Sequence, residues 1–226
     1  MCGIVGFISH KVINSESIIR SMSDEIEHRG PDSYGYFADN SSGIFLGFRR
    51  LSIIDLSDNG SQPINSFDNR FVMVFNGEIY NFKYLKKIIN QKSNDLINYK
   101  SHSDSEVLVN SFAVLGITET LKIINGQFAI CLWDKKLKKF YLIRDRFGEK
   151  PLYYGWINTG QEKVFAFGSE LKAFRAYPGF QNNISRNALK QYFKYMYVPA
   201  PYSIFEGIYK LEPGCILSIN EPPKGE

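Results

Sequence analysis

Short apolar runs separated by polar turns make up most of the chain, with amphipathic stretches between them. Continuous or alternating apolar positions predict strands, and apolar positions three and four residues apart predict helices. The expected strands are residues 4–8, 34–38, 44–48, 71–75, 126–133, 139–144, 152–156 and 164–167. The expected helices are residues 15–26, 82–89, 103–115, 171–173 and 188–196.

Tight polar turns join several of these strands. The turn at 39–43 connects one pair, and the turn around 134–136 connects another. Asn76-Gly77 is a dipeptide typical of hairpins, so we expect the strand 71–75 to end there and a return strand to begin at Glu78. Short strands paired through turns, with helices before, between and after them, indicate an antiparallel α+β fold rather than alternating βαβ units.

Two segments differ from this pattern. Residues 90–102 are rich in Asn and Lys and are predicted to form a mobile loop. Ser103 and Glu106 then predict a capping box at the start of the next helix. Beyond residue 196 proline becomes frequent. We therefore expect one domain over residues 1–196 and an extended connection over residues 197–226.

Charge and composition exclude several classes of protein. The net charge of +4 is mild and the basic residues are spread along the chain, which argues against a nucleic-acid module. No apolar run approaches the length that crosses a membrane, and the N-terminus lacks a basic leader. The cysteines, at positions 2, 131 and 215, and the histidines have no spacing suited to a metal or a disulfide framework. We expect a cytoplasmic protein with no metal and no membrane contact.

The first candidate for chemistry is the thiol of Cys2, just before the first expected strand. If Met1 is removed, Cys2 carries both a thiol and a free α-amine. Their ordinary pKa values are about 8.5 and about 7.7–8.0, so part of the amine is uncharged near neutral pH and can accept the thiol proton, directly or through a water. This pairing is the terminal-amine form of an activated nucleophile. The alternative is an ordinary buried cysteine.

Further positions supply groups that suit an amino-acid amide. The side-chain amide of Asn76 and the backbone N–H of Gly77 can form an oxyanion hole. Arg50 presents a guanidinium group suited to a carboxylate, whereas Glu78 and Asp104 present carboxylates suited to an ammonium group. Each also has a structural alternative: a plain turn, a surface arginine, a strand-edge charge and a helix N-cap.

Several motifs, in order along the chain, resemble one family. They cover residues 2–6, 28–35, 50–53, 76–81, 103–106, 144–154, 197–201 and 211–214. This set resembles the class II glutamine amidotransferase domain and, more closely, the glutaminase half of glutamine-dependent asparagine synthetase. Glu78 and Pro31 separate it from the sugar-phosphate amidotransferase branch. Phe48 is a departure, since the asparagine-synthetase branch usually has His there.

The resemblance implies both a fold and a reaction. The fold is a four-layer α/β/β/α sandwich of the N-terminal-nucleophile hydrolase type, with two mainly antiparallel sheets. In the implied reaction, L-glutamine and water give glutamate and ammonia through a γ-glutamyl thioester on Cys2, whose own α-amine is the base. Asn76 and Gly77 would form the oxyanion hole.

The resemblance also implies how glutamine is held. Arg50 would bind the α-carboxylate, and Glu78 and Asp104 would bind the α-ammonium group. Main-chain groups of four consecutive residues would line the pocket, namely Leu51, Ser52, Ile53 and Ile54.

A partner for the ammonia is implied as well. The family's ATP-binding Ser-Gly-Gly-x-Asp-Ser loop does not occur in these residues, nor does a Walker-type loop. No cofactor is therefore expected in this chain, and ATP and Mg²⁺ are expected only in the synthetase domain of a longer chain. Aspartate is the expected acceptor, and a sugar carboxylate in surface-polysaccharide synthesis is the alternative. A non-catalytic docking scaffold is a further alternative, and a homodimer is possible.

Overall fold

A computed structural model of the chain, which describes residues 1–9, 14–53, 55–160 and 162–220, places two antiparallel sheets at the centre of the molecule. The six-stranded sheet has the order β10 (Ile208–Lys210), β8 (Tyr153–Asn158), β9 (Lys163–Gly168), β1 (Gly3–Ile8), β3 (Ile44–Arg50) and β2 (Ser33–Asp39). The five-stranded sheet has the order β11 (Ile216–Asn220), β7 (Lys139–Arg144), β6 (Gly126–Asp134), β5 (Phe71–Ile79) and β4 (Ile64–Asn65).

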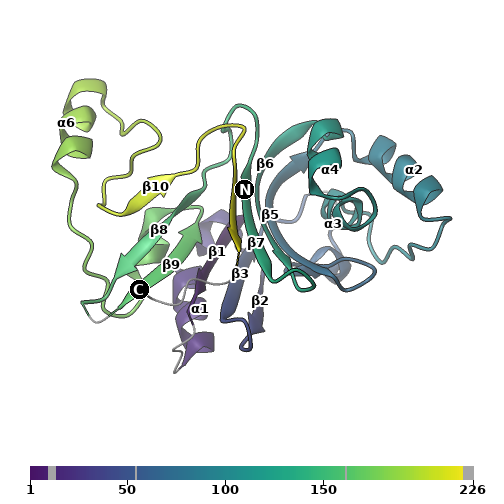
Figure 1. Cartoon of the computed structure of the whole chain (residues 1–226), viewed down its shortest axis with the longest axis horizontal. Helices are drawn as coiled ribbons and strands as arrows, with labels where there is room; N and C mark the ends of the chain where they lie inside the picture. Colours follow the sequence, from purple (N-terminus) through teal and green to yellow (C-terminus); the bar gives the residue numbers. More distant parts are fainter. Residues whose placement is uncertain (10–13, 54, 161, 221–226) are drawn as a thin grey trace.

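Helices cover the outer face of each sheet, which gives the molecule four layers (Figure 1). The six-stranded sheet is covered by α1 (Ser15–Asp24) and α5 (Leu171–Arg175). The five-stranded sheet is covered by α2 (Phe82–Lys92), α3 (Asp104–Leu115) and α4 (Ile117–Ile123). Helix α6 (Arg186–Tyr195) lies at one end of the molecule, away from these layers (Figure 1). The predicted α/β/β/α sandwich is confirmed.

Alternation along the strands divides the apolar side chains between the layers. In β1, Ile4 and Ile8 pack between the two sheets, whereas Val5 and Phe7 pack with the residues of α1. Because both faces of each sheet are buried, the strands occur in the sequence as nearly continuous apolar runs. This is why the pattern of apolar positions located the predicted strands to within a few residues of their observed bounds, and it located the predicted helices equally well.

The predicted hairpin at Asn76-Gly77 is wrong. Strand β5 continues without a turn to Ile79, and it pairs along its whole length with β6, with Asn76 opposite Ala129 and Gly77 opposite Phe128. Long-range pairing has overridden the local turn preference of the dipeptide. The glycine has a different purpose, since a Cβ at Gly77 would lie 2.1 Å from the carbonyl oxygen of Gln127 on the neighbouring strand.

Residues beyond 196 contribute to both sheets. Strand β10 pairs with β8 at one edge, and β11 pairs with β7 at an edge of the other sheet. The pattern analysis missed both strands, together with α4 and β4, because each is short. The division of the chain into a domain over 1–196 and a connection over 197–226 stays a prediction, and residues 221–226 lie outside the described part of the chain.

The polar segment before α3 is tied to the start of that helix. Helix α2 extends through its first residues to Lys92, and the mobility predicted for the remainder is untested. Ser103 caps α3 by accepting a hydrogen bond from Glu106 N at 3.3 Å. The Glu106 carboxylate does not complete the predicted capping box; it accepts hydrogen bonds from Lys100 N and Ser101 N at 2.9 and 2.8 Å.

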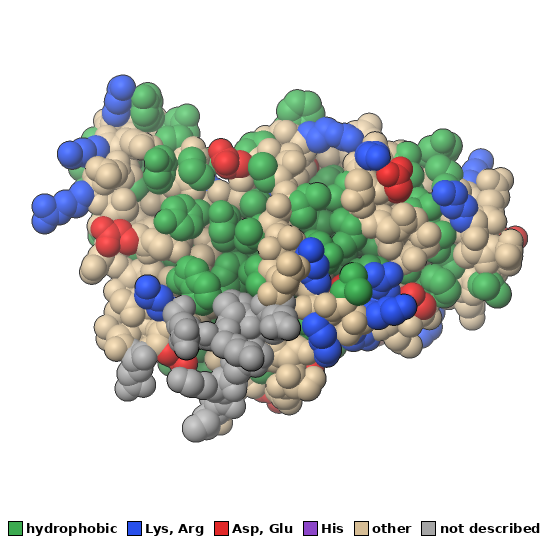
Figure 2. Space-filling model, viewed as in Figure 1, with side chains coloured by type: hydrophobic (Ala, Val, Ile, Leu, Met, Phe, Trp, Pro, Cys, Tyr) green, Lys and Arg blue, Asp and Glu red, His purple; other side chains and the backbone are tan. Residues whose placement is uncertain are grey.

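Two features of the surface are relevant to partners. In the part of the chain that the structure describes, no helix is both long enough and apolar enough to span a membrane. Large apolar side chains are exposed on and just after α6, at the end of the molecule where Figure 2 shows hydrophobic and basic side chains together. They are Leu189, Tyr192, Phe193, Tyr195, Met196 and Tyr197.

Candidate active site

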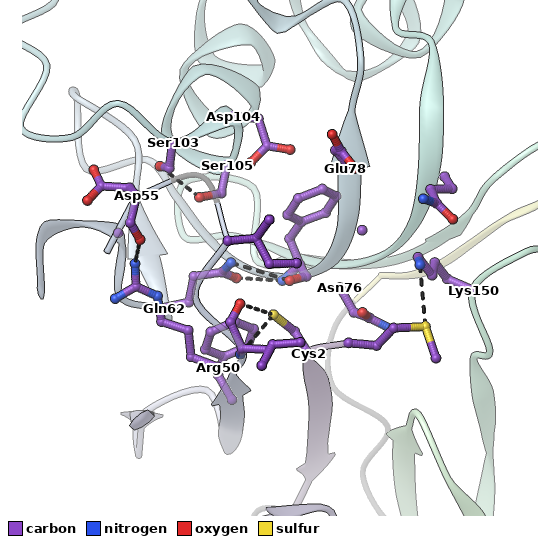
Figure 3. A pocket seen from close by; sticks show the side chains of 18 residues that line it. Cys2, Arg50, Asp55, Gln62, Asn76, Glu78, Ser103, Asp104, Ser105 and Lys150 are labelled. Atoms are coloured by element: carbon purple, nitrogen blue, oxygen red, sulfur yellow. Dashed lines mark hydrogen bonds between the residues drawn. The ribbon is translucent and has the colours of Figure 1, made fainter. Parts of the chain in front are cut away.

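A pocket lies where the core between the two sheets ends (Figure 3). Alternate residues of a strand share one face. In three segments that meet here, the side chains that face the space between the sheets are apolar up to this point and polar beyond it. The last apolar and first polar of these side chains are Ile4 and Cys2 at β1, Phe48 and Arg50 in β3, and Val74 and Asn76 in β5. The fold therefore gathers side chains that are far apart in the sequence.

The Cys2 thiol is held against the start of the segment that follows β3. Its Sγ accepts a hydrogen bond from Leu51 N at 3.4 Å and lies 3.6 Å from Leu51 O. Arg29 Nε donates to the Cys2 carbonyl oxygen at 3.0 Å, and Glu170 accepts from the Arg29 guanidinium at 2.9 Å. Burial raises the pKa of the Cys2 thiol, against the lowering effects of the Leu51 N–H and of nearby positive charges. The thiol therefore needs a base to become a nucleophile at neutral pH.

Arg50 is buried and its guanidinium group is fixed by backbone carbonyls. It donates to Ser57 O at 2.7 Å and to Asp55 O. The Asp55 carboxylate accepts hydrogen bonds from the hydroxyl and the N–H of Ser57 and from His102 N, and these bonds lower the pKa of Asp55 to about 2. The hydrogen bond to His102 N therefore ties Asp55 to the chain just before α3, and the hydrogen bonds to Asp55 O and Ser57 O hold the Arg50 guanidinium group at the pocket.

Asn76 carries an amide donor that has no partner among the residues that the structure describes. The side chain is 1% exposed, and its Nδ2 makes no hydrogen bond within the described part of the chain. The backbone just before it is fixed, because Gln62 accepts from Phe75 N at 2.6 Å and donates to Phe75 O at 3.3 Å. Buried donors are nearly always hydrogen-bonded, so this one suits an acceptor atom of a molecule that enters the pocket.

Two carboxylates stand on the other side of the pocket (Figure 3). Glu78 is exposed near the end of β5, whereas Asp104 is buried at the first residue of α3, where it accepts from Ile79 N at 2.8 Å. Burial raises the pKa of Asp104 to about 6, against the lowering effect of the Ile79 N–H, and the charge of Glu78 adds to the increase. A pair of carboxylates near a buried cavity suits a ligand ammonium group.

Most of the predicted residues line this one pocket: Cys2, Arg50, Leu51, Ile53, Asn76, Gly77, Glu78 and Asp104. Ser52 does not line it, and its N–H donates instead to the Asp32 carboxylate at 2.8 Å. Ile54 lies outside the described residues. The roles assigned to all these residues stay predictions at this point.

Other residues that line the pocket were not predicted from the sequence: Met1, Asp55, Gln62, Ser103, Ser105, Gln127 and Lys150. Gln127 lies opposite Glu78 in the pairing of β6 with β5, so the register would have revealed it. The capping pattern could have pointed to Ser103. Lys150 lies in the motif at residues 144–154, but that motif gave it no role in the pocket. For Gln62 no local pattern exists, because a long-range contact brings it to the pocket.

The pocket offers no evident metal site. Within the ranges that the structure describes, no three or more His, Cys, Asp and Glu side chains are grouped so that they could hold a metal ion.

Comparison with known proteins gives the class of this domain. A family model described as a glutamine amidotransferase domain matches residues 1–224. The chain therefore belongs to the family of glutamine amidotransferase domains, and the prediction from its motifs is confirmed.

Two of the curated relatives with a similar sequence are asparagine synthetases. The chain is 39% identical to asparagine synthetase (glutamine-hydrolyzing) 1 of Bacillus subtilis, over 100% of this chain and 34% of that protein. It is 40% identical to asparagine synthetase (glutamine-hydrolyzing) 2 of the same organism, over 79% of this chain and 23% of that protein. The chain thus spans about a third or less of the length of these two relatives.

Solved structures share the fold. Glutamine phosphoribosylpyrophosphate amidotransferase from B. subtilis superposes with a TM-score of 0.70 at 19% identity, over 100% of this chain and 49% of that one. The allosteric regulatory enzyme of purine biosynthesis gives a TM-score of 0.69 at 20% identity, over 100% and 48% of the two chains. At these identities the likeness concerns the sandwich architecture.

Proposed function

We propose that this domain hydrolyses the side-chain amide of L-glutamine to glutamate and ammonia, with Cys2 as the nucleophile. The observation that carries the proposal is the unpartnered amide donor of Asn76 in the same pocket as the Cys2 thiol. Membership of the glutamine amidotransferase family supports the choice of substrate. The proposal requires removal of Met1, which frees the α-amine of Cys2.

The proposed chemistry has two halves. In the first, the α-amine of Cys2 takes the thiol proton while Sγ attacks the amide carbon of glutamine, and Asn76 and Gly77 stabilise the oxyanion. The ammonium group of Cys2 then returns the proton to the leaving nitrogen, the C–N bond breaks, and ammonia departs from a thioester. In the second half, water attacks the thioester, the same amine accepts its proton, and glutamate leaves with the thiol restored.

Charges around the pocket match the two ends of an amino acid. Arg50 supplies a buried positive charge for the α-carboxylate, and hydrogen bonds to Asp55 O and Ser57 O fix its orientation. Glu78 and Asp104 supply negative charge for the α-ammonium group. Because these groups come from separate elements, glutamine binding would depend on the packing of α3 against β5.

Glutamine should bind more weakly as the pH falls through about 6. The pKa of Asp104 is raised to about 6, so above pH 7 this carboxylate is charged and below pH 5 it is mostly neutral. Affinity should therefore be nearly constant from pH 7 to 8 and fall by about tenfold per pH unit below 6. Titration calorimetry on the Cys2→Ala protein would measure the affinity without turnover.

Asp104→Asn is the matched control for this prediction. The amide can still accept the hydrogen bond from Ile79 N, but it has no charge to lose. Its glutamine affinity should be lower at every pH and should no longer fall through pH 6. If the same step persisted in Asp104→Asn, another group would be responsible for it.

We further propose that the ammonia is used in ATP-dependent asparagine synthesis. The similarity to asparagine synthetases supports aspartate as the acceptor, and their greater length supports a synthetase domain as the partner of this one. ATP and Mg²⁺ would then be bound by that partner domain. The apolar side chains exposed at α6 offer surface for such a contact.

The test of the glutaminase proposal uses protein whose loss of Met1 has been verified by intact-mass analysis. Incubation with glutamine should release glutamate and ammonia in equal amounts, and a diazoketone analogue of glutamine should modify Cys2, as read by peptide mass spectrometry. Absence of both hydrolysis and labelling in processed protein would leave a non-catalytic scaffold as the better explanation.

A further inference from the structure

Lys150 is a buried lysine in the wall of the same pocket, and the chemistry proposed above gives it no role. It is 8% exposed, and its Nζ donates to Met1 Sδ at 3.5 Å. Among the residues that the structure describes, no carboxylate lies within 4.0 Å of this ammonium group. A lysine is rarely buried without a negatively charged partner, so its position needs an explanation.

The loop that carries Lys150 is fixed by a polar frame. The buried carboxylate of Asp145 accepts from Lys150 N at 3.1 Å and from Glu149 N at 2.9 Å. Arg144 Nε donates to Lys150 O at 2.8 Å, and another nitrogen of its guanidinium group donates to Gly148 O at 2.6 Å. Hydrogen bonds therefore hold the backbone of Lys150 on both sides, which aims the side chain at the pocket.

Lys150 differs from the other cations near Cys2. Arg29 donates to Cys2 O but forms an ion pair with Glu170. The guanidinium group of Arg50 donates to backbone carbonyls of the segment that follows β3. Lys150 instead contacts the side chain of Met1 (Figure 3). The charged groups that face the pocket around Cys2 are Arg50 from β3, Asp55 after it, Glu78 from β5, Asp104 from α3 and Lys150 from its loop.

We propose that Lys150 is a positioning residue which, after Met1 has been removed, keeps the freed α-amino group of Cys2 uncharged near neutral pH. Cleavage of the bond between Met1 and Cys2 removes the side chain that Lys150 contacts and turns the backbone nitrogen of Cys2, which lines the same pocket as Lys150, into a free amine. A neighbouring positive charge disfavours a second one. The inference rests on the proposed function, because it concerns the base of that reaction.

The same effect assists both proton transfers. An uncharged amine can accept the thiol proton without first losing a proton to solvent. Once it has accepted that proton, repulsion by Lys150 makes the resulting ammonium group a better acid toward the departing nitrogen. A group whose proton affinity is matched to the working pH serves best in both directions.

The experiment compares Lys150→Met, which removes the charge, with Lys150→Arg, which keeps it. The matched control is Lys210→Met, because Lys210 is partly buried but donates to Val198 O outside this pocket. For processed protein, kcat/KM for glutamine is measured from pH 6.5 to 9.5, and each variant is compared with the parent at the same pH, so that the titration of Asp104 near pH 6 affects both proteins equally. In Lys150→Met the acidic limb should move up by about one pH unit, so activity falls about tenfold at pH 6.5 and by less than twofold at pH 9.

The control variants should keep the profile of the parent protein. Both Lys150→Arg and Lys210→Met should leave the acidic limb where it is. A loss of activity in Lys150→Met that was the same at every pH would indicate a structural role and overturn the proposal, as would an unchanged profile. If Lys150→Met did not fold, Lys150→Gln would replace it.

A second measurement separates this inference from the glutaminase proposal. In the Cys2→Ala background, the pH dependence of acetylation of the new N-terminal amine is followed by peptide mass spectrometry, which needs no turnover. Adding Lys150→Met should move the midpoint of this reaction up by about one pH unit. Unchanged acetylation would overturn the role of Lys150 even if glutamine were hydrolysed, whereas a moved midpoint in a protein without glutaminase activity would sustain it.

Discussion

Replacing Cys2 with Ala should lower the rate of glutamine hydrolysis by about a thousandfold or more, because the other two thiols, Cys131 and Cys215, do not line the pocket. The loss should fall on kcat, since the groups that match the ligand charges, Arg50, Glu78 and Asp104, remain. Glutamate release from processed protein at saturating glutamine is the measurement. Intact-mass analysis must show that Met1 is absent from both proteins.

The matched control for the thiol is Cys215→Ala. Cys215 is also a partly buried free cysteine packed against the core between the sheets, but it does not line the pocket. Its replacement should leave the rate of hydrolysis within a factor of two or so. Equal glutamate release from the parent and from Cys2→Ala would reject the role of the thiol.

Asn76→Ala should lower kcat by about a hundredfold to a thousandfold, which corresponds to the loss of one donor from an oxyanion hole. The donor acts on charge that develops in the transition state, so KM for glutamine should change little. The free energy of unfolding should not fall by the amount usual for a buried polar residue, because among the described residues Asn76 Nδ2 has no partner that would lose a hydrogen bond. Steady-state kinetics and urea denaturation together test both statements.

Asn110→Ala provides the opposite combination. Asn110 is also buried, but its Oδ1 accepts from Phe67 N at 2.8 Å, and neither residue lines the pocket. Its replacement should destabilise the fold by about 1–3 kcal/mol and should leave kcat close to that of the parent. If Asn76→Ala behaved like this control, Asn76 would be a structural residue rather than a part of the oxyanion hole.

Much of the fold was predictable because both faces of each sheet are buried. Because of this burial, strands such as β1 and β6 consist of nearly continuous apolar runs, which can be recognised from the local sequence alone. The turn at Asn76-Gly77 was mispredicted because strand pairing, which the local sequence does not show, decides the conformation there. Its local preference is strong, yet pairing with β6 fixes both residues within a strand, and only the register reveals this.

Some residues of the candidate site were likewise predictable from the sequence, and others were not. Cys2, Arg50 and Asn76 stand in motifs, so the sequence could nominate them, and the structure then brings them into one pocket. Gln62 and Lys150 contact Phe75 and Met1, at separations of 13 and 149 residues. Lys150 stands in the motif at residues 144–154, but neither its contact with Met1 nor that of Gln62 with Phe75 can be read from a local stretch of sequence.

The two strands that follow residue 196 have a consequence for how this domain is handled. β10 and β11 are edge strands, and each pairs with the next strand of its sheet, β10 with β8 and β11 with β7. A recombinant fragment cut before β10 would leave the backbone N–H and C=O groups along β8 and β7 unpaired. Unpaired strand edges can pair with another copy of the same chain. Such a fragment would be expected to self-associate into insoluble material, so a cut site for laboratory expression belongs beyond Asn220.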